Sequence, residues 1–179
     1  MEDRFIEENV KTRLIISGIH ELEENGIAGF SLRRAASLAQ VSCAAPYRHF
    51  KSKEEYINQI ILYVISKWEL LSKEIFSVYK NDYRSLVIEI SIANLRFRIA
   101  NRNFPLALAH TKDSGKIIDE SIVRVVRAYC DFRNLPADEC DLMCFSTLTL
   151  ITGAVAMVND ENSEQILKLV AKKLEREFK

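Results

Sequence analysis

Apolar side chains recur every three or four residues along almost the whole chain, which is the period of an α-helix. Val10, Leu14 and Leu22 mark this period near the start, and Ile166, Val170, Leu174 and Phe178 mark it near the end. The 179 residues include only five glycines and three prolines, too few for the dense turns of an all-β protein. No convincing strand pattern or long repeat occurs. The sequence therefore predicts an all-α fold.

Start and stop signals divide this pattern into about nine helices. Asn25-Gly26 ends the first, Ser31 and Ser42 are suitable N-caps for the next two, and Ser52 with Glu55 has the spacing of a capping box. The expected helices cover 10–22, 32–38, 43–50, 53–79, 83–101, a short segment starting near Phe104-Pro105, 117–132, 138–158 and 163–178. Short helices come first and long ones follow. We therefore expect a three-helix head at 1–53 and a larger helical bundle at 54–179.

Positive charge is concentrated in one segment of a chain whose formal net charge is zero. Residues 31–53 contain five bases and no acid, whereas residues 1–30 contain three bases and seven acids. After residue 54 the charges are nearly balanced. A local basic segment of this kind is expected of a surface that binds phosphates.

The same segment has the layout of a helix-turn-helix. The first helix is expected to end near Leu38, the turn is Ala39-Gln40-Val41, and the second helix is expected to begin at Ser42. In such a unit the second helix enters the DNA major groove, so its leading face must be slim. Cys43, Ala44 and Ala45 supply small side chains there.

Residues 12–53 resemble the DNA-binding head of TetR-type transcriptional regulators. The matching features are Gly26, Phe30-Ser31, Ala36 and the run from Val41 to Glu54, with its Tyr-x-His-Phe-x-Ser-Lys-Glu core. One departure is Gln40, because many members of the family have glycine in this tight turn. A glutamine in a left-handed conformation costs on the order of 1 kcal/mol.

The resemblance implies roles for nine residues of the head. Arg33 is placed to read a base edge, where a guanidinium fits guanine, and Cys43, Ala44 and Ala45 are placed to face bases. Ser31, Ser42, Tyr47, His49 and Lys53 are placed to hold phosphates. Ala36 and Phe50 are expected in the core. The alternative is that Tyr47 is also core and that the charges form an ordinary solvated surface.

For the bundle, the resemblance implies a ligand-receiving domain and a homodimer formed by the last two helices. Small residues at Gly153, Ala154 and Ala156 would let helices approach closely, and the stripe on 163–178 could complete a four-helix interface. An intramolecular core explains that stripe equally well. Candidates for lining a ligand pocket are Trp68, Phe97, His110, Tyr129 and Phe145, although each could be ordinary core. This set favours a largely apolar or aromatic ligand.

The remaining features exclude several classes of protein. The charged start MEDRFIEENVKTR is no secretory signal, and the four cysteines contain no CxxC pair, so we expect free thiols in the cytoplasm. Residues 142–159 are uncharged, but Ser146, Thr147 and Thr149 favour a core or interface helix over a membrane span. No catalytic triad order, HExxH motif, phosphate loop or dinucleotide fingerprint occurs, so no enzyme activity or cofactor is expected.

The sequence thus favours a homodimeric, ligand-responsive regulator, a repressor that binds a palindromic operator in double-stranded DNA and is released by a small effector. The rival hypothesis keeps the same head but places control in a protein partner or in cysteine oxidation. Cys140 and Cys144 lie four residues apart on one helical face and could act with Cys130 or His110 as a redox or metal site. A helical enzyme ranks third.

Overall fold

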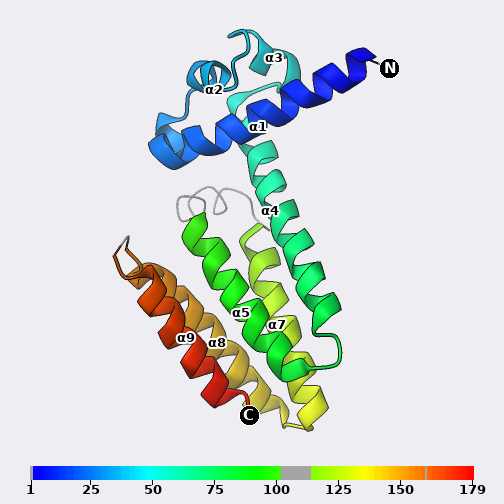
Figure 1. The fold of residues 1–179 in the computed structure, drawn as a ribbon, viewed down its shortest axis with the longest axis vertical. Coiled ribbons are helices and arrows are strands. Elements are labelled where there is room, and N and C mark those ends of the chain that lie inside the picture. Colours follow the sequence, from blue (N-terminus) through cyan, green and yellow to red (C-terminus); the bar gives the residue numbers. More distant parts are fainter. Residues whose placement is uncertain (1, 102–113, 160) are drawn as a thin grey trace. The chain divides into compact units, whose positions relative to one another are not determined.

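The computed structural model describes residues 2–101, 114–159 and 161–179, and it is all-α over these ranges, as predicted (Figure 1). The short helix expected near Phe104-Pro105 lies outside the described residues, as does His110. The described helices are α1 (Glu2–Gly29), α2 (Leu32–Leu38), α3 (Ala45–His49), α4 (Lys53–Val78), α5 (Tyr83–Ala100), α7 (Ser114–Arg133), α8 (Ala137–Met157) and α9 (Ser163–Glu177).

The chain divides into two compact units. Among the described residues, the first unit contains α1, α2, α3 and the part of α4 that ends at Ser66. The second unit contains α4 from Lys67 onward together with α5, α8, α9 and α7 from Gly115. Helix α4 is therefore shared by both units.

Aromatic packing around Tyr56 forms the core of the first unit. The Tyr56 ring stacks on Phe50 at a centroid distance of 4.1 Å and meets the edge of Phe30 at 5.3 Å. Its hydroxyl donates a hydrogen bond to the carbonyl oxygen of Leu14, and burial raises the Tyr56 pKa above its ordinary value. These contacts bring together α1, α4 and the segments that flank α2 and α3.

Gly18 allows α1 and α4 to approach closely. A Cβ atom at position 18 would lie 2.5 Å from Cδ1 of Ile60 and 3.1 Å from the Tyr56 ring. The separation of 2.5 Å is shorter than real Cβ contacts, and Ile60 is fully buried. A glycine inside a helix is therefore explained here by packing, despite its poor helix propensity.

The predicted stop at Asn25-Gly26 is present as a break inside α1. Gly26 has φ 63° and ψ −179°, a conformation that an L-residue rarely adopts, and a further helical turn follows it up to Gly29. The start of α1 at Glu2 lies earlier than the apolar period indicated, because that period becomes regular only at Val10.

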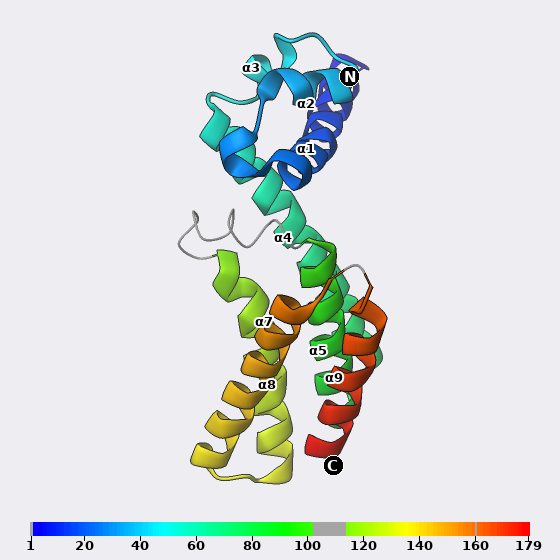
Figure 2. The same ribbon diagram turned by 90° about the vertical axis from the view of Figure 1, so that its left-hand side faces the viewer.

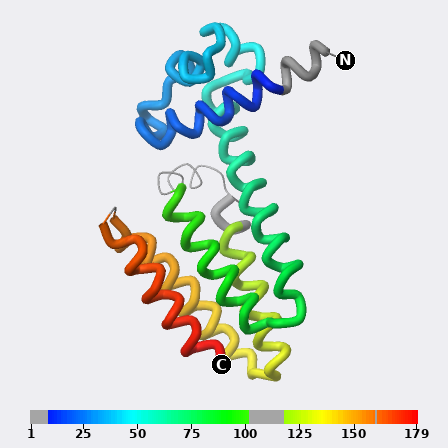
Figure 3. Tube along the Cα trace, viewed as in Figure 1, coloured from blue at the N-terminus to red at the C-terminus, as the bar shows by residue number. Residues whose placement is uncertain are grey.

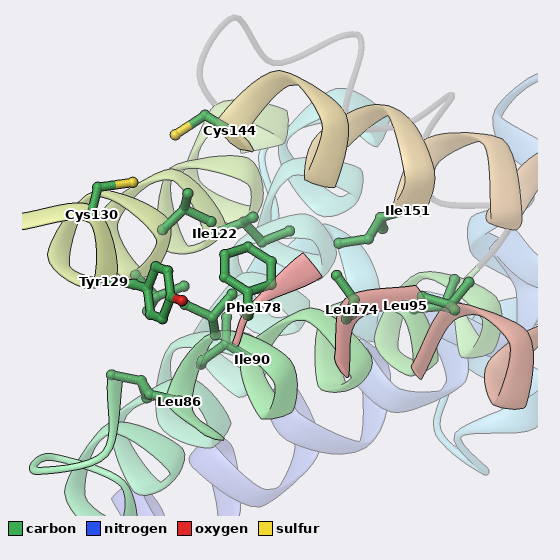
Figure 4. Close-up of a cluster of buried hydrophobic side chains, with 14 of the residues drawn as sticks. Leu86, Ile90, Leu95, Ile122, Tyr129, Cys130, Cys144, Ile151, Leu174 and Phe178 are labelled. Carbon is green, nitrogen blue, oxygen red and sulfur yellow. The ribbon is translucent and has the colours of Figure 1, made fainter. Parts of the chain in front are cut away.

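The helices of the second unit run up and down in sequence, and α8 and α9 form an antiparallel pair (Figures 2 and 3). Their core is shown in Figure 4, where Phe178 lies among side chains from α5, α7 and α9. Tyr129 meets Phe178 edge-on at 5.1 Å. The labelled core residues are Leu86, Ile90, Leu95, Ile122, Tyr129, Cys130, Cys144, Ile151, Leu174 and Phe178.

The apolar stripe of α9 belongs to this intramolecular core. Val170, Leu174 and Phe178 are buried against α5 and α8, so the alternative of an intramolecular core is the correct interpretation of the stripe. The exposed apolar side chains of the α8–α9 pair are different ones, namely Leu142, Phe145, Met157 and Leu169. Apolar residues on both sides of α8 explain why its sequence shows no single stripe.

Helix α8 is also long and apolar enough to cross a membrane by length and composition alone, and 33% of its apolar window is buried. Its buried face carries Cys140, Cys144, Thr147, Ile151 and Ala154, and it packs on α5 and α9. Ala154 therefore faces the core of its own bundle, whereas Gly153 and Ala156 are exposed.

Candidate nucleic-acid interface

The first helix of the helix-turn-helix, α2, begins as predicted at Ser31. The Ser31 hydroxyl accepts a hydrogen bond from the backbone N–H of Arg34 at 3.4 Å. The Ser31 N–H donates to Oε1 of Glu21 at 3.0 Å, which ties the start of α2 to α1. Helix α2 packs on α1 through the buried Ala35 and Ala36, so the core assignment of Ala36 is confirmed.

The turn after α2 contains a residue in the left-handed conformation and is held by hydrogen bonds from an arginine side chain. Gln40 has φ 54°, the left-handed conformation expected where related sequences have glycine. The guanidinium of Arg13, on α1, donates to the carbonyl oxygen of Ala39 and, at 3.4 Å, to that of Gln40. Arg13 was not identified from the sequence, because its partners are backbone atoms 26 and 27 residues away.

The second helix begins later than predicted. Residues 43–44 form a turn, α3 starts at Ala45, and no side chain caps it. The expected N-cap role of Ser42 is therefore wrong; its carbonyl oxygen instead accepts from the N–H of Ala45 at 2.9 Å. The physical reason is Pro46, which lacks an N–H and suits the first helical turn.

Two of the three small residues expected at the DNA are exposed. Cys43 and Ala44 lie on the surface, but Ala45 is only 8% exposed and packs in the core of the first unit. The expectation that Ala45 faces bases is therefore wrong. Ala45 is the first residue of α3 and packs toward the core, whereas Cys43 and Ala44 form the preceding turn and are exposed.

Tyr47 and Phe50 have opposite environments. Phe50 is 2% exposed and stacks on Tyr56, as expected for core. Tyr47 is 69% exposed, which contradicts the alternative that it is a core residue. A large aromatic side chain on a surface is available to an external partner.

The bases of the segment differ in how they are held. Arg33 and Arg48 are exposed, and their guanidinium groups make no hydrogen bond or ion pair with the residues that the structure describes. Arg34 donates from Nε and Nη2 to the carboxylate of Glu21 at 2.9 and 2.6 Å, and this bond raises the Arg34 pKa above its ordinary value. The half-buried Lys53 has its ammonium 6.0 Å from the centre of the Phe30 ring.

Helix α4 starts with the predicted cap, in a modified form. The N–H of Glu55 donates to the Ser52 hydroxyl at 3.1 Å, while the Glu55 carboxylate accepts from the N–H of Lys51 at 2.6 Å. In a standard capping box the return bond would reach Ser52 itself. His49, at the end of α3, is half-buried with its ring 6.3 Å from that of Phe50.

The candidate ligand residues of the second unit do not converge on one pocket. Trp68 and Phe97 pack together with ring centroids 5.3 Å apart. Tyr129 lies in the core against Phe178, and its hydroxyl donates to the carbonyl oxygen of Lys179 at 2.7 Å. Phe145 is 68% exposed on α8. Trp68, Tyr129 and Phe145 line three different hollows, so the expectation that these residues share one interior pocket is wrong.

A hollow of about 440 Å³ lies between α4 and α7 beside Trp68. Apart from Trp68, its lining residues are polar, namely Glu69, Ser72, Lys73, Glu120, Ser121 and Arg124. Trp68 is buried, and its indole N–H has no hydrogen-bond partner within the described ranges. The side chains of Asn94, on α5, and Ser121, on α7, both donate to the carbonyl oxygen of Ile118, and the Asn94 bond joins α5 to α7.

Comparison with known proteins identifies the fold. No family model and no curated protein sequence matches the chain. Among solved structures, the TetR family regulator PfmR from Thermus thermophilus superposes with a TM-score of 0.69 at 17% identity, over 92% of this chain and 97% of that one. FadR from Bacillus subtilis, a transcriptional regulator in complex with stearoyl-CoA, has a TM-score of 0.66 at 12% identity, over 89% and 97%.

A TerR/AcrR family transcriptional regulator from Aquifex aeolicus gives a TM-score of 0.62 at 21% identity, over 94% of this chain and 96% of that one. These three structures are described as transcriptional regulators, not as enzymes. Each matches the chain over nearly its whole length, so the likeness covers both units. The chain has the fold of TetR-type transcriptional regulators.

Proposed function

We propose that the protein is a cytoplasmic transcriptional regulator that binds double-stranded DNA through the exposed residues of α2, α3 and the turn between them. The observation that carries this proposal is the environment of Arg33, Arg48 and Tyr47. All three are exposed on a helix-turn-helix, and the guanidinium groups of the two arginines make no bond with other described residues. Unpaired guanidinium groups on such a surface suit phosphates and guanine edges.

Individual roles within this surface can be separated by mutation. Arg33 is proposed to read a base, so Arg33→Ala should relax specificity at one position of the binding site, at a cost of about 1–3 kcal/mol. Lys53 is proposed to hold a phosphate, so Lys53→Ala should weaken binding to all sequences alike. Selection of duplexes from a random-sequence pool with each variant provides the measurement. If Arg33→Ala selects the same bases as the parent, the role proposed for Arg33 is wrong.

The protein is proposed to act as a homodimer through the exposed apolar face of α8 and α9. Leu142, Phe145 and Met157 on α8 and Leu169 on α9 surround a shallow apolar hollow of about 660 Å³. A contiguous apolar surface of this kind is typical of a protein–protein interface. Two heads on a symmetric dimer could then address the two half-sites of a palindromic operator.

Sedimentation tests the dimer with a matched pair of variants. Phe145→Lys places a charge on the proposed interface, and Val78→Lys places one at another exposed apolar residue, on α4. We expect the parent and Val78→Lys to be dimers and Phe145→Lys to be a monomer with weakened DNA binding. A monomeric parent at micromolar concentration would contradict the proposal.

An effector is proposed to bind in the hollow beside Trp68 and to act on DNA binding through α4. The polar lining and the unpartnered indole N–H support a ligand that carries a hydrogen-bond acceptor, in addition to the apolar part expected from the sequence. FadR, which has the same fold, holds stearoyl-CoA, a molecule with both kinds of group. Release of the operator by such a ligand would make the protein a repressor.

Fluorescence gives a direct test, because Trp68 is the only tryptophan of the chain. Stearoyl-CoA, stearate and coenzyme A are titrated separately. Each of these probes that binds in the hollow should shift the emission of Trp68. Trp68→Phe should abolish the optical signal, so binding by that variant is followed by calorimetry. An emission spectrum that no acyl, acid or nucleotide probe alters would speak against an effector site at Trp68.

A further inference from the structure

A buried carboxylate lies directly behind the proposed DNA-binding helix α2. The Glu21 residue is 1% exposed, and its Oε1 atom accepts hydrogen bonds from the Ser31 N–H at 3.0 Å and from Nε and Nη2 of Arg34 at 2.9 and 2.6 Å. The Nη2 atom of Arg34 also donates to the carbonyl oxygen of Gly29. A buried carboxylate is stable only when a counter-charge and hydrogen bonds compensate it, and Arg34 supplies both.

Because of this arrangement, the charges of the adjacent residues Arg33 and Arg34 differ in how available they are to DNA. Arg33 is exposed and its guanidinium has no partner in the described part of the chain, whereas three of the donor contacts of Arg34 are directed at Glu21. A phosphate that approached Arg34 would meet the negative charge of Glu21 behind it. The charge of Arg34 is therefore largely unavailable to DNA, although its side chain is 54% exposed.

We propose that Glu21 is a positioning residue that limits the affinity of the DNA-binding surface: it withholds Arg34 from DNA phosphates and fixes the start of α2, so that Arg33 is the arginine of the pair that reaches the duplex. This inference rests on the proposed DNA-binding function. Phosphate contacts carry no sequence information and strengthen binding to every duplex. By removing one such contact from each head, Glu21 lowers the affinity for every duplex alike and leaves the reading of sequence to Arg33.

The variant Glu21→Gln tests this proposal, because glutamine can still accept from the Ser31 N–H but no longer neutralises Arg34. The matched control is Glu74→Gln, which removes the same charge from an exposed residue of α4 in the second unit. Both variants are titrated by fluorescence anisotropy against a duplex selected by the parent protein and against an unrelated duplex of equal length, between 50 and 200 mM salt.

We expect Glu21→Gln to bind the unrelated duplex about tenfold more tightly than the parent at low salt. Its log affinity should depend more steeply on log salt, by about 0.9 for each released arginine that gains a phosphate. The affinity for the selected duplex should rise by the same factor, so that the ratio of the two affinities is unchanged, while Glu74→Gln stays close to the parent. An unchanged affinity and salt slope in Glu21→Gln would overturn the proposal, as would weaker binding of both duplexes.

The double variant Glu21→Gln/Arg34→Gln keeps the test valid if the single variant does not fold. It leaves no buried unpaired charge, and the proposal predicts that its salt slope and discrimination are those of the parent. A salt slope steeper than that of the parent in a folded double variant would contradict the proposal. If the parent selects no duplex at all, the proposed function fails, which is an outcome distinct from failure of the role given to Glu21.

Discussion

The two units of the molecule differ in how their buried polar groups are satisfied. In the first unit, Glu21, the Ser31 N–H and the Tyr56 hydroxyl all have partners, and Arg13 holds the turn after α2. In the second unit, buried atoms of Trp68, Ser91, Asn94 and Thr147 lack partners among the described residues. Unpaired buried polar groups are costly, so their concentration in one unit needs a reason. The functions proposed for the two units, a rigid DNA-binding surface and a ligand-receiving bundle, provide one.

The first prediction separates surface from core within the head, and it has the largest expected effect. Phe50→Ala should lower the free energy of unfolding by about 3–5 kcal/mol, because it empties the buried stack on Tyr56. Tyr47→Ala, three residues earlier, should change stability by less than about 0.5 kcal/mol but weaken DNA binding. Denaturant unfolding and gel shift measure the two effects. Equal stability losses in both variants would mean that Tyr47 is also a structural residue.

Close packing of the first unit gives the second prediction. Gly18→Ala gains helix propensity but places a Cβ atom 2.5 Å from Ile60 Cδ1 in a filled core. Overpacking costs about 1–3 kcal/mol, so the net change should be destabilising. A thermal melt provides the measurement. A raised melting temperature would show that Ile60 can move aside easily and that the junction of α1 and α4 is looser than the structure indicates.

The third prediction concerns the departure from the family pattern. Gln40→Gly should stabilise the protein by up to about 1 kcal/mol, because glycine adopts φ 54° without strain. DNA affinity should rise slightly or stay constant, since the turn geometry is unchanged. Chemical denaturation of the two proteins gives the difference. Destabilisation would indicate that the Gln40 side chain makes a contribution that outweighs the backbone cost.

The rival hypothesis of cysteine control leads to the fourth prediction, which has the smallest effect on stability at neutral pH. Burial raises the pKa of the Cys130 and Cys144 thiols, whereas Cys43 is exposed. A disulfide reagent should therefore modify Cys43 quickly and the other three cysteines only on unfolding. Rapid modification of Cys140 or Cys144, with loss of DNA binding, would favour the redox hypothesis.

The raised thiol pKa values also fix the sign of a pH effect. Between the unfolded pKa of about 8.5 and the higher folded values, the folded state holds protons that the unfolded chain has lost. These thiols therefore contribute stability below about pH 8.5 that is lost as the pH rises further. The melting temperature of a Cys130→Ser variant should depend less on pH in the alkaline range than that of the parent.

The sequence predicted the head better than the bundle, for a physical reason. Caps such as Ser31 and Ser52, and the left-handed Gln40, act within three or four residues, so local order along the chain is sufficient to find them. Glu21 and Arg13 act across ten or more residues and became visible only in the structure. The late start of α3 followed from Pro46, a signal that was present but outweighed by Ser42.

In the bundle, the positions of the helices along the sequence were predictable, but the side of each helix that packs against the core was not. A helix with apolar residues all around, such as α8, does not reveal which side meets its own core. Phe145 was therefore expected to line an interior pocket, but it is exposed on α8. The apolar stripe of α9 packs in the core of its own bundle. Pocket residues come from several helices, so their proximity depends on packing that periodicity along one helix does not encode.

The salt dependence of duplex binding tests the central claim most directly. If the basic side chains of α2, α3 and the start of α4 in both heads of a dimer neutralise DNA phosphates, about six to ten phosphate contacts should form. The affinity for a selected duplex should then fall on the order of 10³–10⁵-fold between 50 and 200 mM salt. An affinity that stays constant over this range, or a parent protein that selects no duplex, would contradict the assignment of this surface to DNA.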